Sequence, residues 1–199
     1  KQMLDNPQEE YTKSLWAVRS FQSPQRHRPK DGVPLISVRN VDASYTGGAK
    51  VLDDVSFDIY EGMTVAVVGE SGSGKSTTAR VITGLLPPSK GEVLFKGKPF
   101  PPNYKDRTKD QLRQCQMIYQ MADTALNPKV RISEIIGRPA AFYSGLKGVA
   151  LKNRVDELLD LIELEPSQYY NRYPPELSGG QKQRIGIARA LAAEPTFIV

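Results

Sequence analysis

The stretch Gly69-Glu70-Ser71-Gly72-Ser73-Gly74-Lys75-Ser76-Thr77 decides the fold of this chain. It matches G-x-x-x-x-G-K-[ST], a loop whose backbone N–H groups surround phosphate groups. Residues 64–68 before it are apolar and β-branched, which predicts a buried strand, and residues 77–83 predict the start of a helix. A glycine-rich loop between a strand and a helix N-terminus attracts anions. The alternative is a Gly/Ser-rich turn that binds no ligand.

Each residue type in the loop suits one part of a nucleotide. Lys75 would reach the β- and γ-phosphates, and the Ser76 hydroxyl would bind Mg²⁺. The sequence therefore predicts a site for ATP and Mg²⁺. The expected phosphate-binding residues are Gly69, Ser71, Gly72, Gly74, Lys75, Ser76 and Thr77.

A second anion-binding element is expected at Leu177-Ser178-Gly179-Gly180-Gln181. The apolar residues of the following segment, 182–191, recur with helical spacing, so this segment predicts an amphipathic helix. Ser178 is a natural N-cap, and the two glycines leave the backbone N–H groups at the helix start accessible. By itself the segment could be only a capped turn. With the phosphate-binding loop upstream, we interpret Ser178, Gly179, Gly180 and Gln181 as a second phosphate-binding element.

The order of these motifs resembles that of an ABC-transporter ATPase domain, and more closely that of the ATPases of oligopeptide, dipeptide and nickel importers. The resemblance rests on the stretches VGESGSGKSTTAR, MIYQMADTALNPKVRISEII, RYPPELSGGQKQRIGIARAL and EPTFIV. It implies an α/β fold: a P-loop NTPase core with an antiparallel β-subdomain and a helical subdomain. The domain would cover residues 35–199, with the helical subdomain at residues 124–176.

The resemblance implies roles for two further residues. Tyr45, just before a turn at 46–48, would stack on adenine; the alternative is a strand-end tyrosine that packs on its neighbours. Gln120 would bind Mg²⁺ or orient a water molecule through its amide oxygen; the alternative is a surface glutamine. The family usually continues with Asp-Pro, whereas this chain has Met121-Ala122-Asp123, which leaves the path of the glutamine loop open.

The implied function is ATP hydrolysis that energises an importer of peptides or related small solutes, with Lys75 and Gln120 as catalytic residues. The implied partners are a second ATPase domain in the same chain or a dimer, transmembrane permease subunits and, indirectly, a periplasmic or extracellular solute-binding protein. The implied location is peripheral, on the cytoplasmic face of the inner membrane, with residues 125–128 and 132–136 facing the permease. Two alternatives stay open: a degenerate half-site that binds ATP without hydrolysing it, and a soluble ABC ATPase outside transport.

Composition limits the other possibilities. The chain has 199 residues and a net charge of +5, and its basic residues are scattered, which argues against a nucleic-acid partner. Cys115 is the only cysteine, which excludes an intrachain disulfide and a cysteine-rich metal site. No apolar run approaches the roughly 18 residues that a membrane-spanning helix needs.

The resemblance also implies what the first and the last residues of the sequence are. Residues 1–34 would be the tail of a preceding ATPase half followed by a linker, or alternatively an ordinary amphipathic leader helix. The family's Mg²⁺-binding Asp, catalytic Glu and switch His follow the strand that begins near Thr196, and the sequence does not include them. We therefore expect residues 1–199 alone to be inactive in ATP hydrolysis.

The remaining apolar patterns predict the framework around these motifs. Strands are expected at residues 35–41, 51–60, 92–95, 117–119 and 196–199, with a turn at 96–99. A buried helix face is expected at Val155, Leu158, Leu159 and Ile162, which follow one another at helical spacing.

Overall fold

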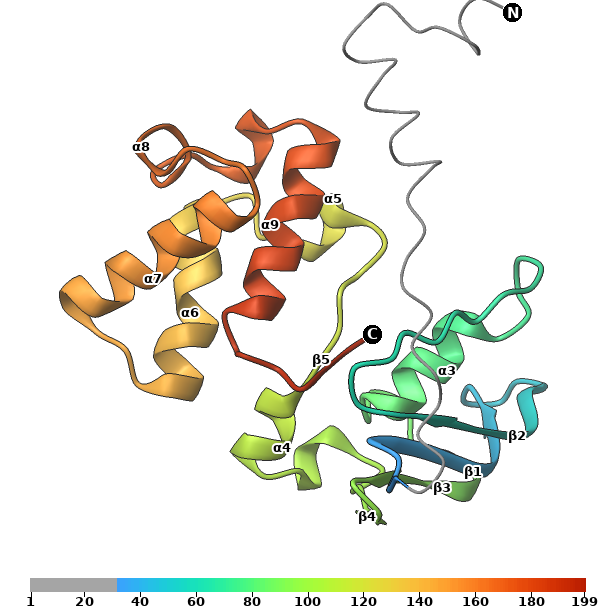
Figure 1. Cartoon of the computed structure of the whole chain (residues 1–199). Coiled ribbons are helices and arrows are strands. Elements are labelled where there is room, and N and C mark those ends of the chain that lie inside the picture. Colours follow the sequence, from blue (N-terminus) through green and yellow to red (C-terminus); the bar gives the residue numbers. More distant parts are fainter. Residues whose placement is uncertain (1–31) are drawn as a thin grey trace, which may run out of the picture.

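The computed structural model describes residues 32–199, so the interpretation of residues 1–31 lies outside the described residues. The chain forms two bodies that differ in secondary structure (Figure 1). The sheet body consists of strands β1 to β4 with helix α3, and the helical body consists of helices α5 to α9. Helix α4 and the short strands β5 and β6 lie between them (Figure 1).

The sheet body is built on an antiparallel sheet of four strands in the order β2-β1-β3-β4. This confirms the strands expected at residues 35–41, 51–60 and 92–95. The turn at 46–48 is also confirmed, because the N–H of Gly48 donates to the Tyr45 carbonyl at 2.9 Å. The turn expected at 96–99 is shorter than predicted, since its last two residues form an edge strand. The strands are β1 (Ile36–Ser44), β2 (Lys50–Ile59), β3 (Lys90–Phe95) and β4 (Lys98–Pro99).

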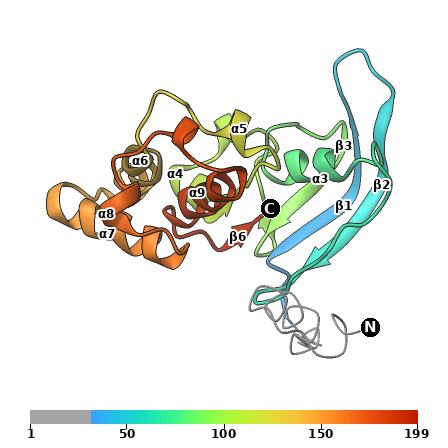
Figure 2. The same cartoon turned by 90° about the horizontal axis from the view of Figure 1, so that it is seen from above.

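Helix α3 (Lys75–Ile82) follows the phosphate-binding loop and covers one face of this sheet (Figure 2). Its Val81 and Ile82 are buried in one apolar cluster with Ile36 and Val38 of β1 and Leu52 of β2. Burial of such side chains contributes about 1.5–3 kcal/mol each. This packing fixes the start of α3, and hence the loop before it, against the end of the β1–β2 hairpin.

The prediction of a strand at residues 64–68 is wrong. This segment is extended but pairs with no strand among residues 32–199. Val67 and Val68 are 51% and 87% exposed, so the apolar run is not buried either. A strand is defined by ladder hydrogen bonds to a neighbour, and no strand in the described part of the chain forms such a ladder with this segment.

A short parallel pair of strands links the two bodies. Strand β5 (Cys115–Gln116) pairs with β6 (Phe197–Ile198). The strand predicted at 117–119 is therefore displaced by two residues toward the N-terminus. Two hydrogen bonds of Val199 continue the pairing: the Ile118 N–H donates to its carbonyl at 2.8 Å, and its own N–H donates to the Gln116 carbonyl at 3.0 Å. The strand expected at 196–199 is present, but Ile198 is exposed, so its burial was predicted wrongly.

The helical body encloses a second apolar core, which is separate from the core under the sheet. The expected buried face is confirmed, because Val155, Leu158, Leu159 and Ile162 all belong to this core. The connection from the sheet body runs through η1 (Tyr104–Asp106) and α4 (Lys109–Gln114). The helices of the body are α5 (Ala122–Ala125), α6 (Ile132–Ser144), α7 (Gly148–Leu161), α8 (Pro166–Tyr169), η2 (Pro174–Glu176) and α9 (Gly179–Leu191).

None of the helices within residues 32–199 combines the length and the apolar character that crossing a membrane requires.

Candidate functional site

The phosphate-binding loop ends at Gly74, which is the N-cap of α3 and has a φ of 92°. A side chain is strained at this φ, and a Cβ atom there would lie 2.7 Å from Leu52 Cδ2 on β2. Glycine therefore allows the loop to turn into the helix while it packs closely on the sheet. The Thr78 N–H and hydroxyl both donate to the Gly74 carbonyl, at 2.8 and 3.1 Å, and fix the first turn of α3.

The Lys75 ammonium folds back over the loop that precedes it. Its Nζ donates to the carbonyl oxygens of Gly69 at 2.9 Å and Glu70 at 2.6 Å. A third contact, to the Ser73 hydroxyl, measures 3.5 Å. A cationic group thus lies on the loop at the start of α3, where a phosphate chain would need it.

The first turn of α3 suits an anion in two further respects. It contains no acidic side chain, and no side chain caps its backbone N–H groups. Unpartnered N–H groups and the helix dipole together favour negative charge at this point. Ser76 is exposed in the same turn, and its hydroxyl is a hard oxygen ligand of the kind that Mg²⁺ prefers beside phosphate oxygens. The residues of this first turn therefore fit a nucleoside triphosphate with its Mg²⁺.

Tyr45 lies beside α3, and its hydroxyl contacts the helix directly. The Tyr45 hydroxyl is 3.3 Å from the Thr77 hydroxyl and accepts a hydrogen bond from Arg80 Nη1 at 3.0 Å. The contact with Thr77 lowers the pKa of the Tyr45 hydroxyl below its ordinary value, and Arg80 adds to this effect. Tyr45 as a whole is 39% exposed, so part of its surface remains open to a ligand.

Sequence reasoning gave Arg80 no role, because the phosphate-binding pattern ends before it, at Thr77. The signal that could have found it is its spacing: residues three apart on a helix are neighbours on one face. Once Thr77 faces Tyr45, Arg80 must face it as well.

The segment Ser178–Gln181 forms the helix start that the sequence predicts. Ser178 is the N-cap of α9, and its hydroxyl accepts from the Gln181 N–H at 3.3 Å. In return, Gln181 Oε1 accepts from the Ser178 N–H at 2.9 Å, which completes a capping box. Gly179 and Gly180 have open space where a Cβ would stand, so backbone N–H groups are approachable there.

The structure does not bring Lys75, Gln120 and Ser178 together in one site. Gln120 is exposed and lines a groove of about 300 Å³ between the residues that follow β5 and helix α9. Lys75 is not among the residues that line this groove. Figure 1 shows α9 within the helical body and α3 against the sheet, so Ser178 and Lys75 belong to different bodies.

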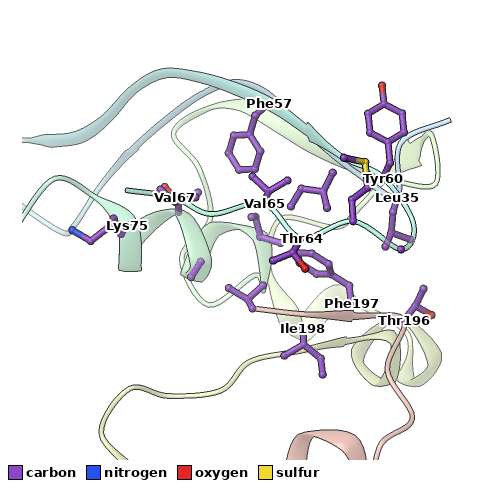
Figure 3. Close-up of a pocket in the computed structure, with 17 residues that line it drawn as sticks. Leu35, Phe57, Tyr60, Thr64, Val65, Val67, Lys75, Thr196, Phe197 and Ile198 are labelled. Atoms are coloured by element: carbon purple, nitrogen blue, oxygen red, sulfur yellow. The ribbon is translucent and has the colours of Figure 1, made fainter. Parts of the chain in front are cut away.

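The cavity that Lys75 helps to line does not suit a phosphate chain. It has a volume of about 520 Å³ and lies between residues 64–67 and strand β6. Its walls are mainly apolar, with Phe57, Val65 and Phe197 prominent, and such walls do not suit a triphosphate. In Figure 3 the Lys75 amine points away from these side chains. The cavity explains why Val65 and Val67 are exposed: they face this space, not a neighbouring strand.

Comparison with known proteins gives the same assignment as the motifs. A family model described as "ABC transporter" matches residues 52–199. The oligopeptide transport ATP-binding protein OppF of Haemophilus influenzae is 46% identical over 151 residues, which covers 75% of this chain and 45% of that protein. The nickel import ATP-binding protein NikE of Brucella suis is 43% identical over 149 residues, which covers 75% of this chain and 56% of that protein. The chain thus spans about half the length of the curated relatives it matches.

Solved structures agree with the fold. A dimeric structure of the ATP-binding cassette MJ0796, in a post-hydrolysis state bound to ADP and Pi, superposes with a TM-score of 0.70 at 35% identity. The match covers 82% of this chain and 72% of that one. CbiO1 from Clostridium perfringens, part of the ABC transporter complex cbiONQ, superposes with a TM-score of 0.68 at 26% identity, covering 83% and 64% of the two chains. The fold, the phosphate-binding loop on α3 and the family match over most of its length together show that this chain belongs to the ABC transporter family.

Proposed function

We propose that this chain binds MgATP and is the nucleotide-binding part of an ATPase subunit that energises import of peptides or related small solutes. The observation that carries the proposal is the loop at the start of α3, where Lys75 lies over an uncapped helix N-terminus without acidic side chains. The similarity to oligopeptide and nickel import ATP-binding proteins supports an importer.

Catalysis in this proposal is mainly electrostatic. The N–H groups at the start of α3 and the Lys75 ammonium neutralise charge that develops on the γ-phosphoryl group. Ser76 would hold Mg²⁺, which supplies further charge neutralisation when it is bound. Gln120 would orient the attacking water, and this role requires the segment after β5 to approach Lys75, because the two residues line different hollows.

The separation of Ser178 from Lys75 supports a mechanism with two ATPase domains. A helix N-terminus with open glycines can receive the γ-phosphate of an ATP molecule. Since Ser178 lies in the helical body and Lys75 in the sheet body, Ser178 would contact ATP held by a second ATPase domain. Closure of the two domains on ATP would then drive permease subunits at the cytoplasmic face of the membrane, with a solute-binding protein delivering the cargo.

A substitution at Ser178 tests this mechanism. In the full-length protein, Ser178→Arg places a bulky side chain at the start of α9, far from the loop that contains Lys75. We expect ATP affinity within about threefold of wild type, loss of ATP-induced dimerisation in sedimentation experiments, and loss of cargo uptake. Ser167→Arg is the matched control, because Ser167 is an exposed serine on α8 in the same body; it should retain all three properties.

Two results would contradict the proposal. Loss of ATP binding by the Ser178→Arg monomer would mean that Ser178 and Lys75 serve the same nucleotide. Normal ATP-induced dimers of Ser178→Arg would mean that the start of α9 does not contact a second domain's ATP.

A further inference from the structure

Arg80 joins Tyr45 to the phosphate-binding helix through two different contacts. Its Nη1 donates a hydrogen bond to the Tyr45 hydroxyl at 3.0 Å. Its Cζ lies 5.8 Å from the centroid of the Tyr45 ring, within the range of a cation–π contact. Arg80 itself is exposed and makes no contribution to the apolar core under the sheet.

Thr77 completes the arrangement from the other end of the same helical face. It is buried, with 4% of its surface exposed, and its hydroxyl is 3.3 Å from that of Tyr45. The phenol oxygen is therefore held by two residues of α3, one buried and one on the surface. Tyr45 follows the last residue of β1 and has no regular strand pairing of its own to hold it.

We propose that Arg80 is a positioning residue for base recognition: it fixes the Tyr45 ring beside the phosphate-binding loop so that the ring can stack on the base of a nucleotide. This inference rests on the proposed function, since it assumes that the loop binds a nucleoside triphosphate. Because α3 carries both the phosphate-binding residues and the residues that hold the ring, one helix sets the distance between the phosphate end and the base end of the site.

The physical reason is the cost of ordering a ring at the end of a strand. An exposed aromatic side chain samples several rotamers, and stacking requires one of them. A hydrogen bond and a cation–π contact from Arg80 select that rotamer before the ligand arrives. Removing both contacts should weaken base-dependent affinity about fivefold, and it should leave phosphate-dependent affinity nearly unchanged.

Comparison of two ligands separates the base-dependent affinity from the phosphate-dependent affinity. Titration calorimetry would measure the affinities of MgATP and of Mg-tripolyphosphate, which has the phosphates but no base. We expect wild type to prefer ATP by about tenfold or more, because base–aromatic stacking is worth that much. Arg80→Ala should reduce this preference about fivefold. Arg80→Lys, which keeps the charge and one donor, should restore part of it.

Two further variants identify the route of the effect. Tyr45→Ala should remove most of the preference for ATP, and adding Arg80→Ala to Tyr45→Ala should reduce it no further, since Arg80 acts through the ring. Arg138→Ala is the control for loss of one positive charge, because Arg138 is an exposed arginine on α6 in the other body. It should leave both affinities unchanged.

The outcomes distinguish the inference from the function on which it rests. Equal weakening of both ligands by Arg80→Ala, an unchanged ratio, or an effect that persists in Tyr45→Ala would overturn the role of Arg80. Failure of wild type to bind either ligand would instead contradict the proposed nucleotide site itself.

Discussion

Lys182 on α9 forms an ion pair with Asp123 on α5, with 2.5 Å between Nζ and Oδ1. Asp123 belongs to the triplet Met121-Ala122-Asp123, in which this chain departs from the Asp-Pro of the resembling family. A second contact reinforces the connection, because Arg189 Nη1 donates to the Ala125 carbonyl at the end of α5. Helix α9, which Ser178 caps, is thus tied directly to the segment that follows Gln120.

The ion pair predicts a local effect of Asp123→Asn. Asp123 is 71% exposed, so the pair contributes little to global stability. Helix α5 has only four residues, however, and depends on its contacts with α9. We expect amide hydrogen exchange at Leu126 to become about two- to threefold faster while the free energy of unfolding stays within ~0.5 kcal/mol. The control is Asp160→Asn, an exposed change on α7; equal exchange at Leu126 in both variants would contradict the tether.

The core of the helical body predicts a contrast between two leucines of α7. Leu159 is 0% exposed and Leu161 is 66% exposed, although both lie in the last turn of the helix. Leu159→Ala leaves a cavity and should lower the free energy of unfolding by about 2–5 kcal/mol. Leu161→Ala should change it by less than ~0.5 kcal/mol. Urea denaturation of both variants tests this, and similar losses would mean that the buried face is assigned wrongly.

Cys115 predicts a pH dependence of stability. Burial raises the pKa of its thiol to about 11, and the neighbouring Arg107 guanidinium opposes part of that rise. The folded protein therefore keeps the proton at pH values where the unfolded chain, with an ordinary pKa near 9.0, has lost it. The thiol's contribution is fully present below pH 9 and is lost as the pH rises through 11, by about 3 kcal/mol in total.

Cys115→Ala isolates this effect from the tyrosines and lysines that titrate in the same range. The stability difference between wild type and Cys115→Ala in urea should narrow between pH 8.5 and pH 11. A difference that stays constant over this range would show that the thiol is not desolvated in the folded protein.

Local sequence patterns predicted those parts of the fold whose partners are close in the chain. The β1–β2 hairpin and the face of α7 around Leu159 are set by alternation and by helical spacing, and both are present. The prediction of a buried strand at residues 64–68 failed, because burial of a strand depends on neighbours that local patterning does not identify. The same limit applies to residues 117–119, where the pairing that defines β5 begins two residues earlier, at Cys115.

The candidate site shows the same division. The loop before Lys75 and the capping box at Ser178 are local motifs: Ser178 caps α9 as predicted, and α3 begins at Lys75, two residues before the predicted start. The contact of Tyr45 with Arg80 joins residues 35 positions apart, so no local pattern contains it. How Gln120 and Ser178 lie relative to Lys75 is likewise a property of the two bodies, which only the three-dimensional arrangement gives.

Titration of MgATP into wild type and Lys75→Ala measures whether the loop at the start of α3 binds nucleotide phosphates through Lys75. We predict at least tenfold weaker binding by Lys75→Ala, about 1.4 kcal/mol, because the phosphates lose their direct cationic partner. Lys105→Ala, which removes an exposed lysine on η1, controls for the change in net charge and should bind as wild type does. Equal affinity of wild type and Lys75→Ala for MgATP would contradict the account.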